Sequence, residues 1–173
     1  MTLSSKSNTI NALGIFGRLE PEQEKYFAEL EKRFSKRPVE DDANGLFSHL
    51  SLVINKVISV GEIPKYLDLL RELKHHLPFK IKASDVIIKD EKHLALSFDT
   101  SQTQEIRDLA GKYFKEGVIE TYYTKVVWFV PKENQEEAIK ELKKVKEMVF
   151  YNFILVANRQ NDENTIYSST RFI

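Results

Sequence analysis

The sequence predicts an α+β fold built from two similar halves, and three observations support this. Apolar segments with strand periodicity alternate with amphipathic helical segments along the chain. The order of these segments over roughly 91–173 repeats their order over roughly 10–90. The 173 residues, 42% of them hydrophobic, suit one compact domain with a sizeable core. Two such halves are expected to pack about a pseudo-twofold axis with a ligand cleft between them, and residues 1–9 are expected to be flexible.

The first half is predicted to be β-α-β-α-β. Pro21 suits the first turn of a helix, and the glutamates that follow it favour the positive helix end. Pro64 begins a second helix with leucines on one side, and Pro78 ends it. Apolar residues alternate in the remaining segments, which predicts strands at 10–16, 46–54 and 79–88.

The second half is predicted to be β-α-β-α-β-β. Ser101 and Gln104 form a capping box, and Gly117 closes the helix that they begin. Helical spacing of apolar residues predicts a further helix over 134–149. Strands are expected at 93–99, 118–130, 150–157 and 166–173, the last two as a hairpin. The repeat is one of elements, because the letters of the two halves do not match convincingly.

The composition excludes several classes of protein. The 26 basic and 26 acidic residues balance, so the chain lacks the basic surplus of a protein that coats nucleic acid. The absence of cysteine excludes disulfide scaffolds, cysteine-ligated metals and thiol catalysis. The N-terminus does not read as a secretory signal, and the apolar runs are too short to span a bilayer. A cytoplasmic monomer without membrane contact is expected.

Among the four histidines, His49 is the candidate for chemistry. The period of two in its strand places Leu50 and Leu52 on one face and His49 and Ser51 on the other. An imidazole exchanges protons near neutral pH, and a hydroxyl two residues away can donate to a phosphate oxygen. A buried structural histidine is the alternative interpretation. The other three histidines are expected at a helix end or, for His93, on the surface.

This order of elements, with His49-Leu50-Ser51-Leu52 as its one motif, resembles the 2H phosphoesterase superfamily. That superfamily includes LigT-like 2′-5′ RNA ligases and cyclic nucleotide phosphodiesterases, and the resemblance covers 10–173. It implies a bilobal fold in which antiparallel sheets flank a central cleft. It also implies that each half supplies one His-x-Thr/Ser motif, with the two histidines acting as base and acid on a phosphodiester. No metal or other cofactor is implied.

The second motif of the superfamily is not intact in this sequence. One register places Lys125 where the histidine belongs and Val127 where the threonine belongs. The other register places Tyr122 and Thr124 there. The first is preferred because it turns Trp128 and its neighbouring valines inward. Either register lacks a second histidine.

Three further residues are candidate ligands in the cleft. Lysine in solution has a pKa of about 10.4 and is a cation at neutral pH, so a lysine at position 125 suits a phosphate better than a proton. Tyr123 could stack on a base, whereas the valines beside Trp128 favour a core position for that ring. Arg159 follows a strand and is a candidate phosphate ligand, with an exposed turn arginine as the alternative.

Three functions follow as hypotheses. The first is an enzyme that acts on cyclic or 2′,5′-linked nucleotides or RNA ends, with His49 as acid or base and Ser51 as a phosphate donor. The second is an inactive relative that binds a nucleotide or an RNA end in the same cleft. The third is an interaction protein whose cleft is vestigial. The missing histidine favours the second and third, whereas His49 and Ser51 keep the first open.

Overall fold

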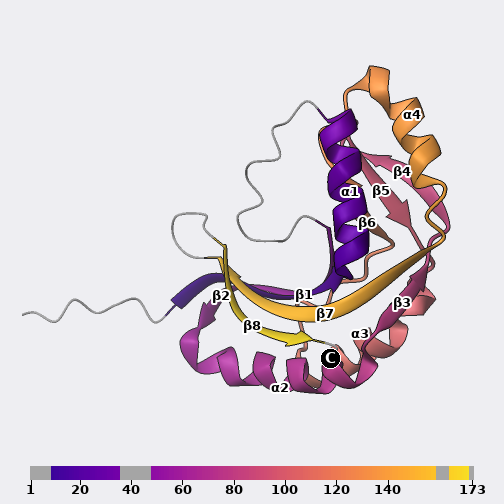
Figure 1. Ribbon diagram of the computed structural model, residues 1–173. Coiled ribbons are helices and arrows are strands. Elements are labelled where there is room, and N and C mark those ends of the chain that lie inside the picture. Colours follow the sequence, from indigo (N-terminus) through magenta and orange to yellow (C-terminus); the bar gives the residue numbers. More distant parts are fainter. Residues whose placement is uncertain (1–8, 36–47, 159–163, 172–173) are drawn as a thin grey trace, which may run out of the picture.

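The computed structural model describes residues 9–35, 48–158 and 164–171 and shows an α+β fold with two antiparallel sheets (Figure 1). The larger sheet contains the strands β1 (Thr9–Leu19), β2 (His49–Ser59), β3 (Phe79–Lys82), β7 (Glu147–Asn158) and β8 (Asn164–Arg171). The smaller sheet contains β4 (Asp85–Lys89), β5 (His93–Ser97) and β6 (Tyr123–Val127). The helices are α1 (Pro21–Phe34), α2 (Ile63–Leu73), α3 (Gln104–Tyr113) and α4 (Lys132–Leu142).

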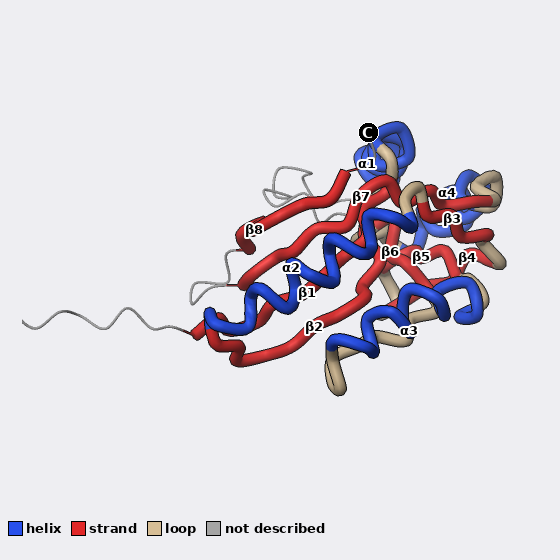
Figure 2. Tube along the Cα trace, turned by 90° about the horizontal axis from the view of Figure 1, so that it is seen from below, coloured by secondary structure: helices blue, strands red, loops and turns tan. Residues whose placement is uncertain are grey.

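Each sheet is covered by two helices, so the molecule has two lobes. In the larger sheet the order is β2-β1-β7-β3, with β8 also paired to β7, and α2 and α3 lie across one face (Figure 2). In the smaller sheet the order is β4-β5-β6, and α1 and α4 pack against it. The cores of both lobes are apolar, with side chains such as Leu52, Leu69, Phe153, Leu96 and Val126 fully buried.

The predicted α+β fold with antiparallel sheets on either side of a cleft is confirmed. Helix α1 begins at Pro21, which occupies its first turn, and two glutamates follow there as expected. The C-terminal hairpin is also present, because β7 and β8 pair along most of their length.

The prediction of one strand over 79–88 is wrong. The segment forms two strands in different sheets, because β3 pairs with β7 whereas β4 pairs with β5. The chain crosses from the larger to the smaller lobe at Ala83 and Ser84, whose amides bond to the carbonyls of Lys146 and Ser97 respectively. Continuous strand periodicity therefore concealed a change of sheet.

Two predicted boundaries are also wrong. Helix α4 ends at Leu142, and the residues from Glu147 onward belong to β7, in which Met148 and Phe150 alternate toward the core. The predicted strand over 118–130 is reduced to β6, since Val118 instead forms a bridge to Val53 at the edge of β2. Both errors arise because apolar residues fit two periodicities over short windows.

Elements that follow one another in the sequence often belong to different lobes, an arrangement that we call the exchange of elements. Helix α1 follows β1 of the larger sheet but packs on β6, and α3 follows β5 of the smaller sheet but packs on β2 and α2. In the same way β4 pairs with β5 in the smaller sheet, and β7 pairs with β1 in the larger sheet. Each lobe is therefore built from segments that are distant in sequence.

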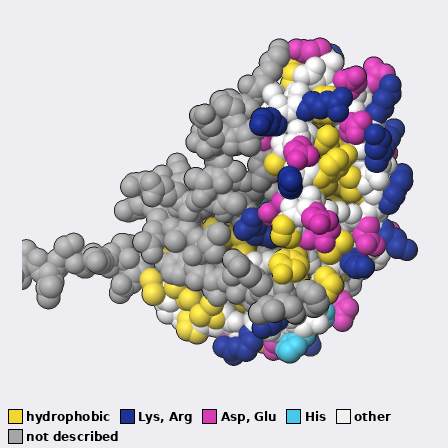
Figure 3. All heavy atoms as spheres, in the orientation of Figure 1, with side chains coloured by type: hydrophobic (Ala, Val, Ile, Leu, Met, Phe, Trp, Pro, Cys, Tyr) yellow, Lys and Arg dark blue, Asp and Glu magenta, His cyan; other side chains and the backbone are white. Residues whose placement is uncertain are grey.

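The described surface carries both signs of charge side by side, which agrees with the zero net charge (Figure 3). Within the described residues, none of the helices has the length and apolar character needed to cross a membrane.

Candidate functional site

A cavity of about 260 Å³ lies between the facing edges of the two sheets. One wall is strand β2 and the other is strand β6, with the segment that precedes β6 closing the gap between them. The lining residues are His49, Ser51, Ile54, Ile119, Thr121, Tyr123, Thr124, Lys125 and Trp128. Four of the five residues proposed from the sequence thus meet in one place, although His49 and Lys125 are 125 − 49 = 76 residues apart.

His49 and Ser51 stand on the face of β2 that borders the cavity. Both are partly exposed, whereas Leu50 and Leu52 between and beside them are buried, as the period of two predicts. The ring of His49 makes an edge-to-face contact with Phe16 of β1, with centroids 5.0 Å apart. This contact supports one side of the imidazole, and the ring still lines the cavity.

Tyr123 and Lys125 provide the matching pair on β6. Both are partly exposed and line the cavity, while Thr124 between them is 1% exposed. A tyrosine and a lysine two residues apart therefore face the histidine and serine two residues apart. Neither register considered for the sequence contains this pair, although alternation along β6 was the signal that could have revealed it.

A bulge in the smaller sheet explains why the first register, Lys125 with Val127, does not place both residues in the cavity. Leu94 pairs with Val127 but Ala95 pairs with Lys125, so β6 has one extra residue at this point. Val126 and Val127 are both fully buried as a result, which places Val127 in the core and not beside Lys125. In the other register, Thr124 lines the cavity although it is 1% exposed, whereas Tyr122 is 47% exposed and lies outside the cavity lining.

Lys125 is held in place by an acid and an aromatic ring. Its ammonium nitrogen lies 3.0 Å from Oδ2 of Asp90 and 4.9 Å from the ring centroid of Trp128. The hydrogen bond from Lys125 is the main reason that the pKa of Asp90 is lowered from its ordinary value. The cavity therefore contains a fixed cation that already has an anionic partner.

Trp128 is partly exposed in the cavity wall, so the expectation that it belongs to the core is wrong. Its backbone N–H donates to Oε1 of Glu31 at 2.9 Å, and Glu31 is itself 1% exposed. The next residue, Phe129, has φ +54°, a left-handed conformation that is unusual for a bulky side chain. Glu31 on α1 thus fixes the backbone that presents the tryptophan ring.

His93 also supports this backbone, and its expected surface position is wrong. The side chain is buried, and Nδ1 accepts the backbone N–H of Phe129 at 3.2 Å. Its ring packs against both Trp128 and Phe129, at centroid distances of 4.7 and 4.9 Å. Two buried polar side chains from different elements therefore hold the strained turn behind the cavity.

The segment before β6 needs a glycine to reach the edge of β2. Gly117 has φ +87°, and a Cβ atom there would lie 2.1 Å from Oδ1 of Asn55. Its carbonyl accepts the N–H of Ile54, and Ile119 donates to the carbonyl of Leu52. These bonds place Ile119 and Thr121 in the cavity wall.

Arg159, the remaining proposed ligand, lies outside the described residues. Within those residues, acids and histidines do not gather into a group of three that could hold a metal ion.

Comparisons with known proteins give matches at the level of structure only. The chain matches no protein-family model and no curated protein sequence. Among solved structures, E. coli LigT in apo form is 15% identical with a TM-score of 0.55, over 96% of this chain and 99% of that chain. E. coli LigT complexed with NADP+ is 14% identical with a TM-score of 0.52, over 94% and 98%. A structure described as a phosphoesterase gives the same four values as the NADP+ complex.

These matches extend over nearly the whole length of both chains and include both lobes. At such low identity they show the fold alone. The fold of this chain is therefore that of the LigT-like phosphoesterases.

Proposed function

We propose that the cavity between β2 and β6 binds the phosphate of a nucleotide or of an RNA end, in 2′,3′-cyclic or 2′,5′-linked form. The observation that carries this proposal is the meeting of His49, Ser51, Tyr123 and Lys125 in one cavity. Together they supply a cation, two hydroxyl donors and an imidazole, which are the groups that bind a phosphate and move a proton. The structures of LigT hold NADP+, 3′-AMP, ATP or phosphate, all of which carry phosphate.

If the protein is an enzyme, His49 is the group that exchanges the proton. In hydrolysis of a 2′,3′-cyclic phosphate, His49 takes a proton from water as its oxygen bonds to phosphorus. The bond from phosphorus to one ribose oxygen breaks, and the hydroxyl of Tyr123 gives that oxygen a proton. The proton held by His49 then returns to Tyr123. Lys125 and Ser51 neutralise and orient the phosphate oxygens.

The alternative is a binding protein with little or no turnover. Tyr123 lines the wall of the cavity that faces His49, and a phenol is a weaker acid than a second imidazolium would be. Because a positioned acid or base contributes roughly 10²–10⁴ in rate, replacing a histidine by a tyrosine is expected to reduce turnover strongly. A vestigial cleft in an interaction protein is the third outcome.

The test is hydrolysis of a panel of 2′,3′-cyclic nucleotides and 2′,5′-linked dinucleotides by the wild type and by His49→Ala. His75→Ala is the matched control, because His75 is exposed after α2 and outside the cavity lining. Turnover that is lost at least 100-fold in His49→Ala and kept in His75→Ala is expected for the enzyme.

Thermal stabilisation by the same compounds is measured in parallel. Stabilisation without turnover, reduced only in His49→Ala, assigns the binding function. If the wild type shows neither turnover nor stabilisation, the enzymatic function and the binding function are both contradicted. The vestigial cleft is then the remaining hypothesis.

A further inference from the structure

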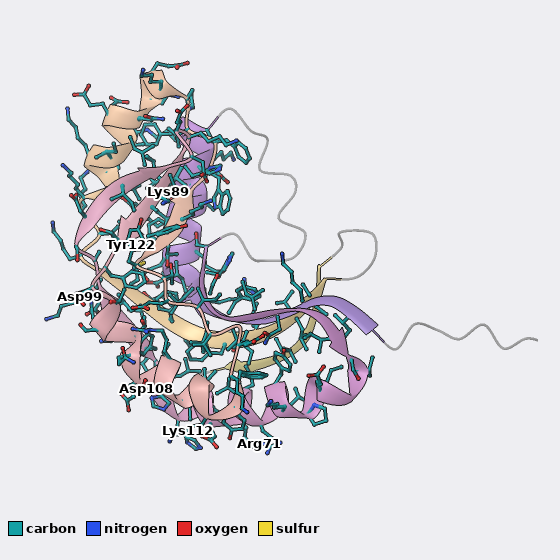
Figure 4. The ribbon with its side chains drawn as sticks, turned by 180° about the vertical axis from the view of Figure 1, so that it is seen from behind. Arg71, Lys89, Asp99, Asp108, Lys112 and Tyr122 are labelled. Carbon is teal, nitrogen blue, oxygen red and sulfur yellow. The ribbon has the colours of Figure 1, made fainter. Side chains whose placement is uncertain are left out.

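A second cation lies beside the cavity, at the end of β4. The ammonium nitrogen of Lys89 is 4.6 Å from the ring centroid of Tyr123 and 5.6 Å from that of Tyr122. It also lies 3.4 Å from the hydroxyl oxygen of Tyr122. We call Lys89, Tyr122 and Tyr123 the Lys89 cluster. Tyr123 belongs to this cluster and to the cavity wall, so the two adjoin. Figure 4 labels Lys89 and Tyr122 of the cluster.

The two cations differ in their acidic partners. Lys125 is paired with Asp90, whereas the ammonium of Lys89 has no carboxylate within 4.0 Å among the residues that the structure describes. Its hydrogen bond with the Tyr122 hydroxyl is the main reason that the pKa of Lys89 is raised, so it remains charged at neutral pH. The Lys89 cluster thus carries a positive charge without a carboxylate in direct contact among the described residues, and Asp90, which is paired with Lys125, acts on it only over a longer range.

This charge is also preorganised. Long lysine side chains lose conformational freedom when they bind a ligand, and two aromatic rings already restrict this one. Tyr122 is 47% exposed and makes an edge-to-face contact with Tyr123 at 5.0 Å. An exposed aromatic ring beside a cation is the combination by which proteins hold phosphate-linked nucleotides.

We propose that the Lys89 cluster is a second anion subsite, which binds a second phosphate group of the same ligand whose first phosphate occupies the cavity. The inference rests on the proposed function of the cavity and narrows its ligand to a molecule with two phosphates. A nucleic acid strand carries them on successive nucleotides, and a nucleoside polyphosphate carries them in tandem. The shared chemistry is the second phosphate.

The experiment compares three probes by calorimetry. The one-phosphate probe is the 2′,5′-linked dinucleotide of adenosine. The two-phosphate probes are the same dinucleotide with a 5′-phosphate, which represents a strand, and ADP, which represents a polyphosphate. Each is titrated into the wild type, Lys89→Ala, Lys89→Arg and Lys112→Ala. Lys112 is the matched control, because it is an exposed lysine on α3 in the other lobe (Figure 4).

Lys89→Ala is expected to lose about fivefold in affinity for a two-phosphate probe, while its affinity for the one-phosphate probe stays within about twofold. Lys89→Arg should restore the loss, and Lys112→Ala should show none. The affinity of the wild type for that probe should also fall more steeply with salt than that of Lys89→Ala. If Lys89→Ala loses affinity only for the phosphorylated dinucleotide, the subsite recognises a nucleic acid strand. If it also loses affinity for ADP, the subsite accepts a second phosphate from either kind of ligand.

Two results would overturn the inference, and they are distinguishable. If Lys89→Ala weakens all three probes equally or none of them, while the wild type binds the one-phosphate probe, the cavity stands and the second subsite fails. If the wild type does not bind even the one-phosphate probe, the proposed function of the cavity fails and the second subsite fails with it.

Discussion

Asp90 is the residue that most limits the cavity as an anion site. Its carboxylate holds the ammonium of Lys125 at 3.0 Å, so a phosphate that enters must share or displace this partner. Asp90 has φ +53° in the turn between β4 and β5, a conformation that aspartate and asparagine tolerate well. An asparagine at this position therefore removes the charge without disturbing the turn.

We expect Asp90→Asn to bind phosphate more tightly, by about threefold, because Lys125 no longer has a competing anion. The measurement is a calorimetric titration with adenosine 2′-monophosphate. Asp108→Asn on α3 makes the same charge change away from the cavity and should leave the affinity unchanged. Equal gains in the two variants would show that net charge, and not the release of Lys125, is responsible.

The pH dependence of this gain follows from the lowered pKa of Asp90. A carboxyl group whose pKa is lowered by a cation stays ionised, and keeps that cation paired, until the pH falls through the lowered value. The ratio of affinities between Asp90→Asn and the wild type should therefore be constant from about pH 5 to about pH 8. It should approach one only below the ordinary pKa of 3.8.

At the scale of the residue, sequence reasoning located the site through alternation in β2. His49 and Ser51 stand out because the leucines beside them are obligatory core residues. The same reasoning failed on β6, where a bulge buries two successive valines and shifts the cavity-facing pair to Tyr123 and Lys125. A bulge depends on how two strands pair, and the sequence of one strand does not determine it.

Helix α1 shows how a helix that follows β1 of the larger sheet supports the cavity wall formed by β6 of the smaller sheet. Its buried Glu31 accepts the N–H of Trp128, and Ser35, directly after the helix, donates to the carbonyl of Phe129 at 3.3 Å. These contacts join the helix to the strained turn that carries the tryptophan. Pro21 and the glutamates that follow it predicted the start of α1, but nothing in the sequence pattern singled out Glu31.

We expect Glu31→Leu to lower the free energy of unfolding by about 1–3 kcal/mol, since it leaves a buried N–H without its acceptor. The emission of Trp128, the chain's single tryptophan, should shift in the same variant because its backbone support is lost. Glu31→Gln keeps an acceptor oxygen and should recover most of both effects. Chemical denaturation and the fluorescence spectrum are the measurements, and identical behaviour of the two variants would contradict the role of the acceptor.

The boundary between β3 and β4 could not be predicted from the sequence, because it depends on which sheet each strand joins. The segment over 79–88 has a continuous strand pattern, yet it is divided between two sheets at Ala83 and Ser84. Periodicity reports which side chains face the core, and both Ile81 of β3, which is buried, and Val86 of β4, which is partly buried, pack in the core. Which sheet a strand joins is decided by partners far away in the sequence.

At the scale of the whole molecule, the exchange of elements should make the two lobes unfold together. The chain passes between the lobes six times, at the connections β1 to α1, α1 to β2, β3 to β4, β5 to α3, α3 to β6 and α4 to β7. We expect the unfolding curve from circular dichroism, which averages both sheets, to coincide with the curve from Trp128 fluorescence. Two separate transitions would contradict this coupling.

The duplication of the two halves, predicted from the sequence, stays a prediction. The exchange of elements between the lobes suggests which strands of the two halves correspond. We interpret 10–90 and 91–173 as two equivalent units in which β1, β2 and β4 correspond to β5, β6 and β7. The third of these strands in each unit, β4 or β7, then pairs with the first strand of the other unit. The first helix of each unit likewise packs on the sheet of the other.

The same exchange has a consequence for how a ligand is selected. Two lobes joined by one linker can close on a ligand by a hinge motion, whereas repeated crossings of the chain restrict the movement of one lobe relative to the other. The opening between β2 and β6 is therefore an aperture of preset width. A ligand is then selected by whether it fits the existing opening between β2 and β6. Binding should therefore be accompanied by little reorganisation of the backbone.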